Sequence, residues 1–130
     1  MNAHKFVAEH GVEQAKSILE KAPETATHFT EALGGHYAKE VMLKMRPQWA
    51  WFNTINKEWY YDFAAKEHIE LAELKQVVES LDTIDRLFGL DQAKQTMVIA
   101  KEIGYSSDYE QIKQAIEDYK HVQAYKNGDA

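Results

Sequence analysis

The sequence predicts an α+β fold, in which a small antiparallel β-sheet lies between two short N-terminal helices and three C-terminal helices. Two observations indicate it: apolar residues recur at helical spacing at both ends of the chain, and aromatic residues crowd its middle. The length of 130 residues fits one domain over 1–130. We divide that domain into a helical segment 1–23, a β-rich segment 25–63 and a helical segment 67–126.

The N-terminal segment predicts two short helices. Asn2 can cap the first, because its side-chain oxygen can accept a free backbone N–H of the first turn. Gly11 interrupts the apolar pattern. Pro23 ends the second helix, since proline lacks a backbone donor and restricts the residue before it. The apolar residues of the second helix are Val12, Ala15, Ile18, Leu19 and Ala22.

Residues 48–63 are interpreted as a β-hairpin. Its strands would be 48–53 and 58–63, joined by 54–57, where Asn56 tolerates the left-handed conformation of a tight turn. Because side chains alternate across a strand, a loop of even length fixes both faces. One face then carries Ala50, Phe52, Trp59, Tyr61 and Phe63, and the other carries Trp49, Trp51, Asn53, Tyr60 and Asp62.

Two further strands are expected near 27–32 and 36–42, on either side of a turn at Gly34-Gly35. The second of these segments is ambiguous. Tyr37, Val41 and Met45 also fit one face of a helix, and the sequence leaves both interpretations open.

The C-terminal segment predicts three helices. Gly89 can end the first, Asp91 can cap the second, which ends near Gly104, and Ser107 with Glu110 forms a capping box for the third. The first helix has an apolar seam that could serve a dimer as well as a core, so the chain could be a monomer or a dimer. That seam consists of Leu71, Leu74, Val78, Leu81, Ile84 and Leu87.

Composition excludes several classes of function. The chain has no cysteine, which rules out disulfides, a thiolate nucleophile, iron–sulfur clusters and the common structural zinc sites. The net charge of −6 gives no general basic field for duplex DNA. Residues 1–63 carry a net −1 and residues 64–130 a net −5, whereas the stretch 39–57 carries +3.

Motifs for catalysis are missing from the sequence. It has no GxSxG elbow, no phosphate-cradling loop and no HExxH or HxxxH pair. His28 and His36 could meet across the Gly34-Gly35 turn, although ordinary half-buried histidines are the simpler interpretation. We therefore predict no catalytic residue, no cofactor and no metal site.

The expected location is the cytoplasm, without membrane association. The first residues contain no apolar signal core, and apolar runs fall short of the ~20 residues that span a bilayer.

Several stretches along the chain form an ordered pattern: 5–11 (KFVAEHG), 15–16 (AK), 22–29 (APETATHF), 57–59 (KEW) and 112–119 (IKQAIEDY). In this order they resemble small accessory proteins encoded by bacteriophages and prophages, with the first thirty residues as the specific part. The resemblance implies a phage origin and transfers no catalytic residue. By analogy, such proteins commonly bind a host protein, and anti-CRISPR inhibitors are one such class.

These observations predict a non-enzymatic interaction protein that binds a host protein or nucleoprotein complex, and the sequence leaves open whether it also inhibits that complex. The favoured inhibitory role is anti-defence, such as anti-CRISPR activity. The hairpin carries more aromatic surface than one face can bury, and exposed Trp and Tyr often mark binding sites. The candidate contacts are Trp49, Trp51, Tyr60, Arg46 and Lys44, with Glu70, Glu73, Asp82 and Asp85 as an acidic alternative.

Three alternatives remain open. The basic aromatic hairpin could bind single-stranded nucleic acid by stacking bases and following the phosphate backbone. A pocket with converging polar groups would instead indicate a ligand-binding protein or an enzyme. Helices could also cover both faces of the hairpin, which would remove the docking surface.

Overall fold

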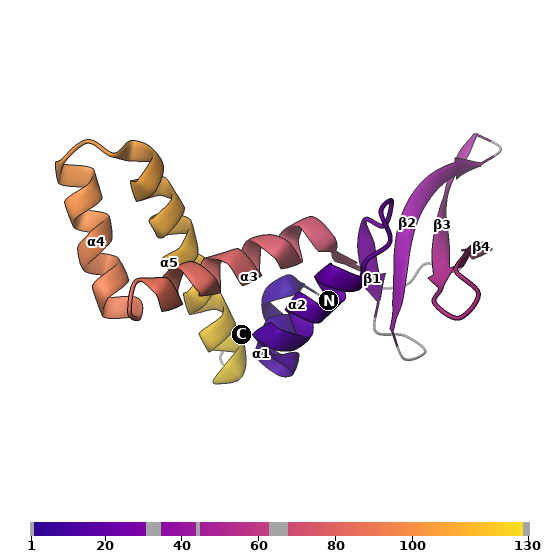
Figure 1. Ribbon diagram of the computed structural model, residues 1–130, viewed down its shortest axis with the longest axis horizontal. Helices are drawn as coiled ribbons and strands as arrows, with labels where there is room; N and C mark the ends of the chain where they lie inside the picture. Colours follow the sequence, from indigo (N-terminus) through magenta and orange to yellow (C-terminus); the bar gives the residue numbers. More distant parts are fainter. Residues whose placement is uncertain (1, 31–34, 44, 63–67, 129–130) are drawn as a thin grey trace.

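The computed structural model describes residues 2–30, 35–43, 45–62 and 68–128 (Figure 1). Within these residues the chain forms five helices and a five-stranded antiparallel sheet, which confirms the α+β fold. In chain order the elements are α1 (Ala3–His10), α2 (Val12–Lys21), β1 (His28–Thr30), β2 (His36–Leu43), β3 (Arg46–Asn53), β4 (Glu58–Asp62), β5 (Ile69–Glu70), α3 (Leu71–Arg86), α4 (Leu90–Glu102) and α5 (Ser106–Lys126).

The helices gather at one end of the molecule and the sheet forms the other end (Figure 1). The strand order is β4-β3-β2-β1-β5, so β5 and β1 lie at the edge of the sheet nearest the helices and β4 lies farthest from them. The two-residue strand β5 leads directly into α3. The sheet is therefore joined to the helices at its β1–β5 side.

The two N-terminal helices form as the sequence predicts. Asn2 caps α1, with its Oδ1 accepting from the backbone N–H of Lys5 at 2.8 Å. Gly11 has a φ of 88°, a conformation that glycine adopts without a steric penalty and that separates α1 from α2.

The hairpin register confirms the predicted faces for the described residues. Four residues, 54–57, separate β3 from β4, so Trp51 pairs with Tyr60 and Ala50 pairs with Tyr61. Phe63, the last residue of the predicted strand, lies outside the described residues. The left-handed residue of the turn is Lys57, with a φ of 62°, and not Asn56. The Asn56 side chain instead accepts a hydrogen bond from the backbone N–H of Glu58 at 3.1 Å.

The ambiguous segment after Gly35 is a strand, not a helix. Residues of β2 pair with β1 on one side and with β3 on the other. The two neighbouring strands therefore supply hydrogen-bond partners for the backbone N–H and C=O groups of β2, which a helix would have paired within itself. Of the predicted strand 27–32, the described residues form β1 over His28–Thr30, and Thr27 precedes the strand. Residues 31 and 32 lie outside the described part of the chain.

Strand β5 was not expected, because 67–126 was predicted as a helical segment without strands. Phe29 pairs with Ile69, and the backbone N–H of Leu71 donates to the carbonyl of Thr27 at 2.9 Å. Two paired residues are too few to show alternating polarity in a sequence. Only the long-range pairing with β1 identifies the strand.

Two helix caps differ from the prediction. Gly89, not Asp91, is the N-cap of α4, and Asp91 lies in the first turn. Tyr105 is the N-cap of α5, so Ser107 lies inside the helix and forms no capping box with Glu110. Both helices begin earlier than the capping motif predicts. The capping side chain then lies inside the helix, where it cannot reach the free backbone N–H groups of the first turn.

The core consists of two clusters. The larger combines α1, α2, the β1–β2–β5 part of the sheet, α3 and Val122 of α5. The smaller lies among α3, α4 and α5 and contains Ile84, Ala93, Ile112, Ala115 and Ile116. Most of the predicted seam of α3 is buried within the chain, in these two clusters.

Tyr37 links the sheet to α2. Its hydroxyl is buried and donates to the backbone carbonyl of Ile18, and burial raises the pKa of Tyr37 above its ordinary 10.0. Since the folded state favours the neutral phenol, this contribution to stability is present below pH 10.0 and is lost as the pH rises through the raised pKa.

We expect Tyr37→Phe to lower the free energy of unfolding by about 1 kcal/mol at neutral pH, because a buried hydrogen bond is lost. Above about pH 10 the difference from the wild type should shrink. Urea unfolding over a range of pH measures both effects. The exposed Tyr61→Phe is the control, and an equal loss in both variants would contradict the assignment.

Candidate functional site

The register of the strands gives the sheet two unlike faces. Phe29, Tyr37 and Ile69 lie on the face that packs into the larger core cluster, against residues of α1 and α2. Side chains alternate along a strand, so the residues between them point to the opposite face. That opposite face, with the ring of His68 that stacks on it, is termed the aromatic face here and comprises His28, His36, Trp49, Trp51, Tyr60 and His68.

Each tryptophan of the aromatic face is held between two other rings. Trp49 stacks on His68 with 4.1 Å between ring centroids, and His28 meets it edge-on at 4.8 Å. Trp51 stacks on Tyr60 at 5.1 Å and contacts His36 at 5.3 Å. These contacts fix the orientation of both indoles.

Both indoles nevertheless keep part of their surface accessible. Trp49 and Trp51 are half-buried, and Tyr60 is 37% exposed. Their neighbours are rings of the sheet and of His68, on the side of the sheet opposite the helical core. His28 and His36 share this face, but they contact different tryptophans.

Among the residues that the structure describes, three glutamates accompany the aromatic face. Glu40 lies opposite Trp49, Glu58 opposite Asn53 and Glu70 opposite His28, and all three glutamates are exposed. Glu58 is also 3.5 Å from the Tyr60 hydroxyl. Glutamate carboxylates therefore lie along the same face as the two indoles.

Arg46, the predicted basic residue that the structure describes, does not lie on the aromatic face. Arg46 is exposed, but alternation along β3 places it on the opposite face from Trp49 and Trp51. Lys39 is also on that opposite face, with its Nζ 4.2 Å from the centroid of the Trp59 ring. Lys44 lies outside the described residues. The structure thus separates Arg46 and Lys39 from the indoles.

The predicted acidic residues do not form one surface. Glu70 is in β5 and belongs beside the aromatic face, whereas Glu73 and Asp85 are exposed on α3. Asp82 pairs with Lys16 of α2 at 3.1 Å, and this hydrogen bond and charge raise the pKa of Lys16. At 1.5 Å per residue, Glu73 and Asp82 lie about 14 Å apart along the helix axis.

A groove of about 440 Å³ lies among α2, α3 and α5. Lys16, Asp82 and Asp85 supply charged groups at its wall, together with the apolar Leu81 and Val122. The groove has the size of a small-ligand site. Lys16 in its wall is already paired with Asp82, at 3.1 Å.

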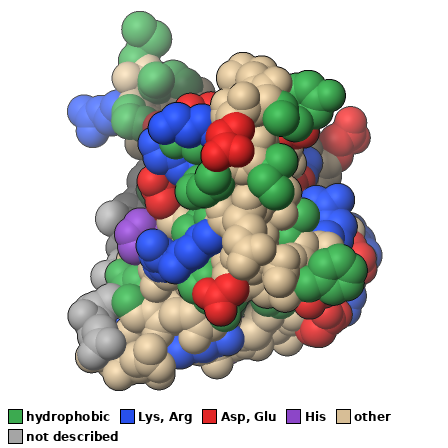
Figure 2. Space-filling view, turned by 90° about the vertical axis from the view of Figure 1, so that its left-hand side faces the viewer, with side chains coloured by type: hydrophobic (Ala, Val, Ile, Leu, Met, Phe, Trp, Pro, Cys, Tyr) green, Lys and Arg blue, Asp and Glu red, His purple; other side chains and the backbone are tan. Residues whose placement is uncertain are grey.

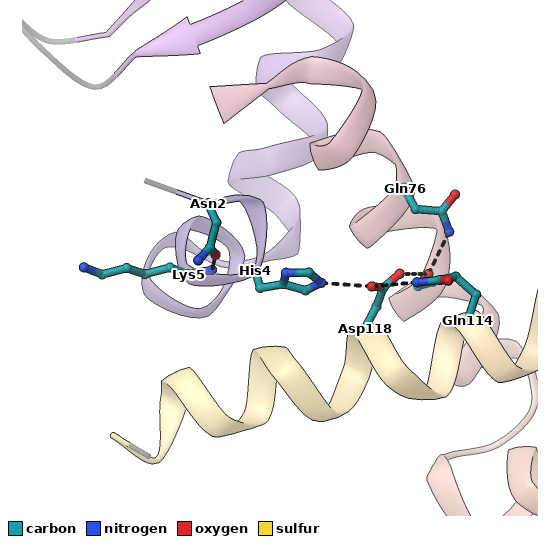
Figure 3. Close-up of polar contacts among 7 residues, drawn as sticks. Asn2, His4, Lys5, Gln76, Gln114 and Asp118 are labelled. Atoms are coloured by element: carbon teal, nitrogen blue, oxygen red, sulfur yellow. Dashed lines mark hydrogen bonds and ion pairs between the residues drawn. The ribbon is translucent and has the colours of Figure 1, made fainter. Parts of the chain in front are cut away.

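A polar network joins three helices and was missed from the sequence. Asp118 of α5 is 3% exposed, and its Oδ1 lies 2.9 Å from His4 Nε2 of α1 (Figure 3). Its Oδ2 accepts from the Ser80 hydroxyl of α3 at 2.6 Å, and Gln114 donates to Oδ1 at 3.1 Å. His4 and Asp118 are separated by 114 residues, so no local motif could reveal the contact.

His121 adds a further potential metal ligand beside this network. The donor atoms of His4, Asp118 and His121 all lie within 4.8 Å of one another. Two imidazoles and a carboxylate are groups that bind zinc in proteins. These three residues could hold a metal ion.

Exposed apolar side chains also occur on the helical end, where none was predicted. Val98, Ile99, Ile103 and Tyr105, at α4 and the link to α5, are each 49–61% exposed. Figure 2 shows this end of the molecule, with hydrophobic side chains interspersed among acidic and basic ones. The apolar surface is broken up by charge and does not form the ordered stacks of the aromatic face.

Comparison with protein-family models, with curated proteins and with solved structures found no match to this chain. Among the residues that the structure describes, no helix combines the length and apolar character that crossing a bilayer requires.

Trp51 and Tyr60 should stabilise each other through their stacked rings. A double-mutant cycle with Trp51→Ala and Tyr60→Ala is expected to give a coupling of about 0.5–1.5 kcal/mol in chemical unfolding. The cycle of Trp51→Ala with Tyr61→Ala is the control, because Tyr61 lies on the other face of β4. Equal coupling in the two cycles would show that the stacking is not specific.

The Lys16–Asp82 pair should make a pH-dependent contribution to the stability of the folded protein. Because the folded pKa of Lys16 is raised above 10.5, the stabilisation is present below that pH and is lost as the pH rises through the folded value. Asp82→Asn should therefore lower the thermal midpoint slightly at about pH 8, and the difference from the wild type should shrink as the pH rises through the raised pKa of Lys16. Glu73→Gln, an exposed change on the same helix, should show no such trend.

Proposed function

We propose that the protein is a non-enzymatic interaction protein that binds a basic surface of another protein through its aromatic face. The observation that carries this proposal is the pair of half-buried, ring-stacked indoles, Trp49 and Trp51, on a sheet face lined with glutamates. The proposal assigns no catalytic step to the chain.

The ring stacks favour binding because they are already ordered. Trp and Tyr are enriched among residues that dominate binding energy, since each buries a large area at a small cost in conformational entropy. Here Trp49 is held by two imidazoles and Trp51 by Tyr60 and His36. Little further ordering of these rings is needed when a partner covers them.

Charge indicates the chemistry of the partner. Arginine and lysine pair with carboxylates and also pack over indole and phenol rings. Glu40, Glu58 and Glu70 place carboxylates beside the aromatic rings, so the face suits a surface rich in arginine and lysine. A nucleic-acid-binding surface of a protein has this composition.

The same geometry disfavours the single-strand alternative. A nucleic-acid groove needs cations beside its stacking rings. Arg46 and Lys39 are on the opposite face of the sheet from Trp49 and Trp51, and the neighbouring glutamates would repel phosphates.

The resemblance to phage accessory proteins supplies the setting of this proposal. A phage protein with an acidic, aromatic docking face would act in the host cytoplasm on a host protein or nucleoprotein complex. Covering a basic channel would inhibit that complex, and anti-defence activity such as anti-CRISPR is the favoured form of inhibition. This step rests on the sequence resemblance and on analogy.

Binding can be tested with labelled probes of known charge. In fluorescence polarisation, we expect the protein to bind a peptide that alternates Arg or Lys with apolar residues, and to bind neither an Asp/Glu peptide of equal length nor oligo(dT). Trp51→Ala should weaken binding about 30-fold, as expected for a central aromatic contact. Glu40→Lys should weaken it about three- to tenfold.

Glu73→Lys provides the matched control. It makes the same charge change at an exposed position of α3, away from the aromatic face, and should alter the affinity less than about twofold. Equal losses of affinity in Glu40→Lys and Glu73→Lys would show that binding depends only on the net charge of the protein, which would contradict the proposal. Binding of oligo(dT) that is lost in Trp51→Ala would favour the nucleic-acid alternative.

A further inference from the structure

The strongest site outside the aromatic face is at the junction of α1 and α5. His4 comes from α1, while Asp118 and His121 are three residues apart on α5 and so share one side of that helix. Figure 3 shows the His4 ring pointing from α1 toward the Asp118 carboxylate. Helix packing thus brings two imidazoles to one carboxylate.

Asp118 is fixed in place by neighbours that are not themselves potential ligands. Ser80 donates to Oδ2 at 2.6 Å and Gln114 donates to Oδ1 at 3.1 Å. Gln76 in turn donates to the Ser80 hydroxyl at 3.1 Å. A buried carboxylate oriented in this way is typical of metal sites, where outer residues hold the ligands in position.

The hydrogen bond between His4 and Asp118 explains the positions of only two of the three potential ligands. His121 is exposed, and its ring lies edge-on to that of His4 with 4.9 Å between the centroids. Nothing in a simple His–Asp contact requires a second imidazole at this distance. A shared cation explains why all three donor groups converge.

We propose that His4, Asp118 and His121 bind Zn²⁺, with water completing a four-coordinate site. Zinc accepts imidazole nitrogen and carboxylate oxygen at about 2.0–2.2 Å, which places neighbouring donor atoms of a tetrahedron about 3.3–3.5 Å apart. His4 Nε2 and Asp118 Oδ1 are 2.9 Å apart, so they would separate by about half an ångström while His121 moves inward. The exposed position of His121 leaves it free to make this movement.

Zinc bound at this site would connect the beginning of the described chain to its last helix. His4 is in the first turn of α1, and His121 is in the second half of α5. A ligand that binds only the folded state stabilises it by mass action. Zinc should therefore raise the thermal midpoint of the whole chain.

The test uses the full chain after treatment with a chelator, titrated with a zinc salt alone. We expect one zinc per chain with about micromolar affinity or tighter in calorimetry. The thermal midpoint should rise by about 5–10 °C when free zinc is about a hundredfold above Kd. Co²⁺ in place of zinc should give the visible absorption of a tetrahedral complex.

His121→Ala is the decisive variant, because this side chain is exposed and its removal should leave the helices intact by circular dichroism. It should abolish binding, and Ser80→Ala should weaken binding about tenfold. The control is His10→Ala, which removes an exposed histidine that lies in α1 and outside the cluster. This variant should bind zinc as the wild type does. No zinc binding at about 100 μM, or equal binding by His121→Ala and His10→Ala, would overturn the proposal.

Discussion

The arrangement of the molecule depends on the pairing of β5 with β1. Phe29 and Ile69 are buried partners in this pairing, and β5 continues directly into α3. The contact therefore attaches the helical end to the sheet and decides which face of the sheet meets α1 and α2. Once Phe29 and Tyr37 point toward the helices, alternation along the strands turns Trp49 and Trp51 away from them.

Local patterns explain how much of this fold could be predicted from the sequence. The parity of the four-residue turn was sufficient to place Trp51 with Tyr60 and Ala50 with Tyr61, because alternation within a hairpin depends only on adjacent strands. Asn2 and Gly11 likewise act within one helical turn. The predicted cap of α5 was wrong. Ser107 and Glu110 match the capping-box motif, but the helix already begins at Ser106.

The features of the fold and of the candidate sites that the sequence could not reveal depend on long-range contacts. Strand β5 exists through its pairing with β1, and the His4–Asp118 contact spans 114 residues. The tryptophans could be selected as candidates from their number alone. The charges beside them could not, because only the register shows that Arg46 faces away from the indoles while Glu40 and Glu70 lie along their face.

The division of the core into two clusters has a consequence for how the molecule opens. Helix α4 buries Ala93 and Ala100 and packs into the smaller cluster alone, whereas α3 and α5 take part in both. Small buried side chains supply little apolar area, so α4 is held less strongly than the helices on either side of it. Its amide protons would exchange with solvent through a partial opening of α4 that leaves the larger cluster, and with it the sheet, intact.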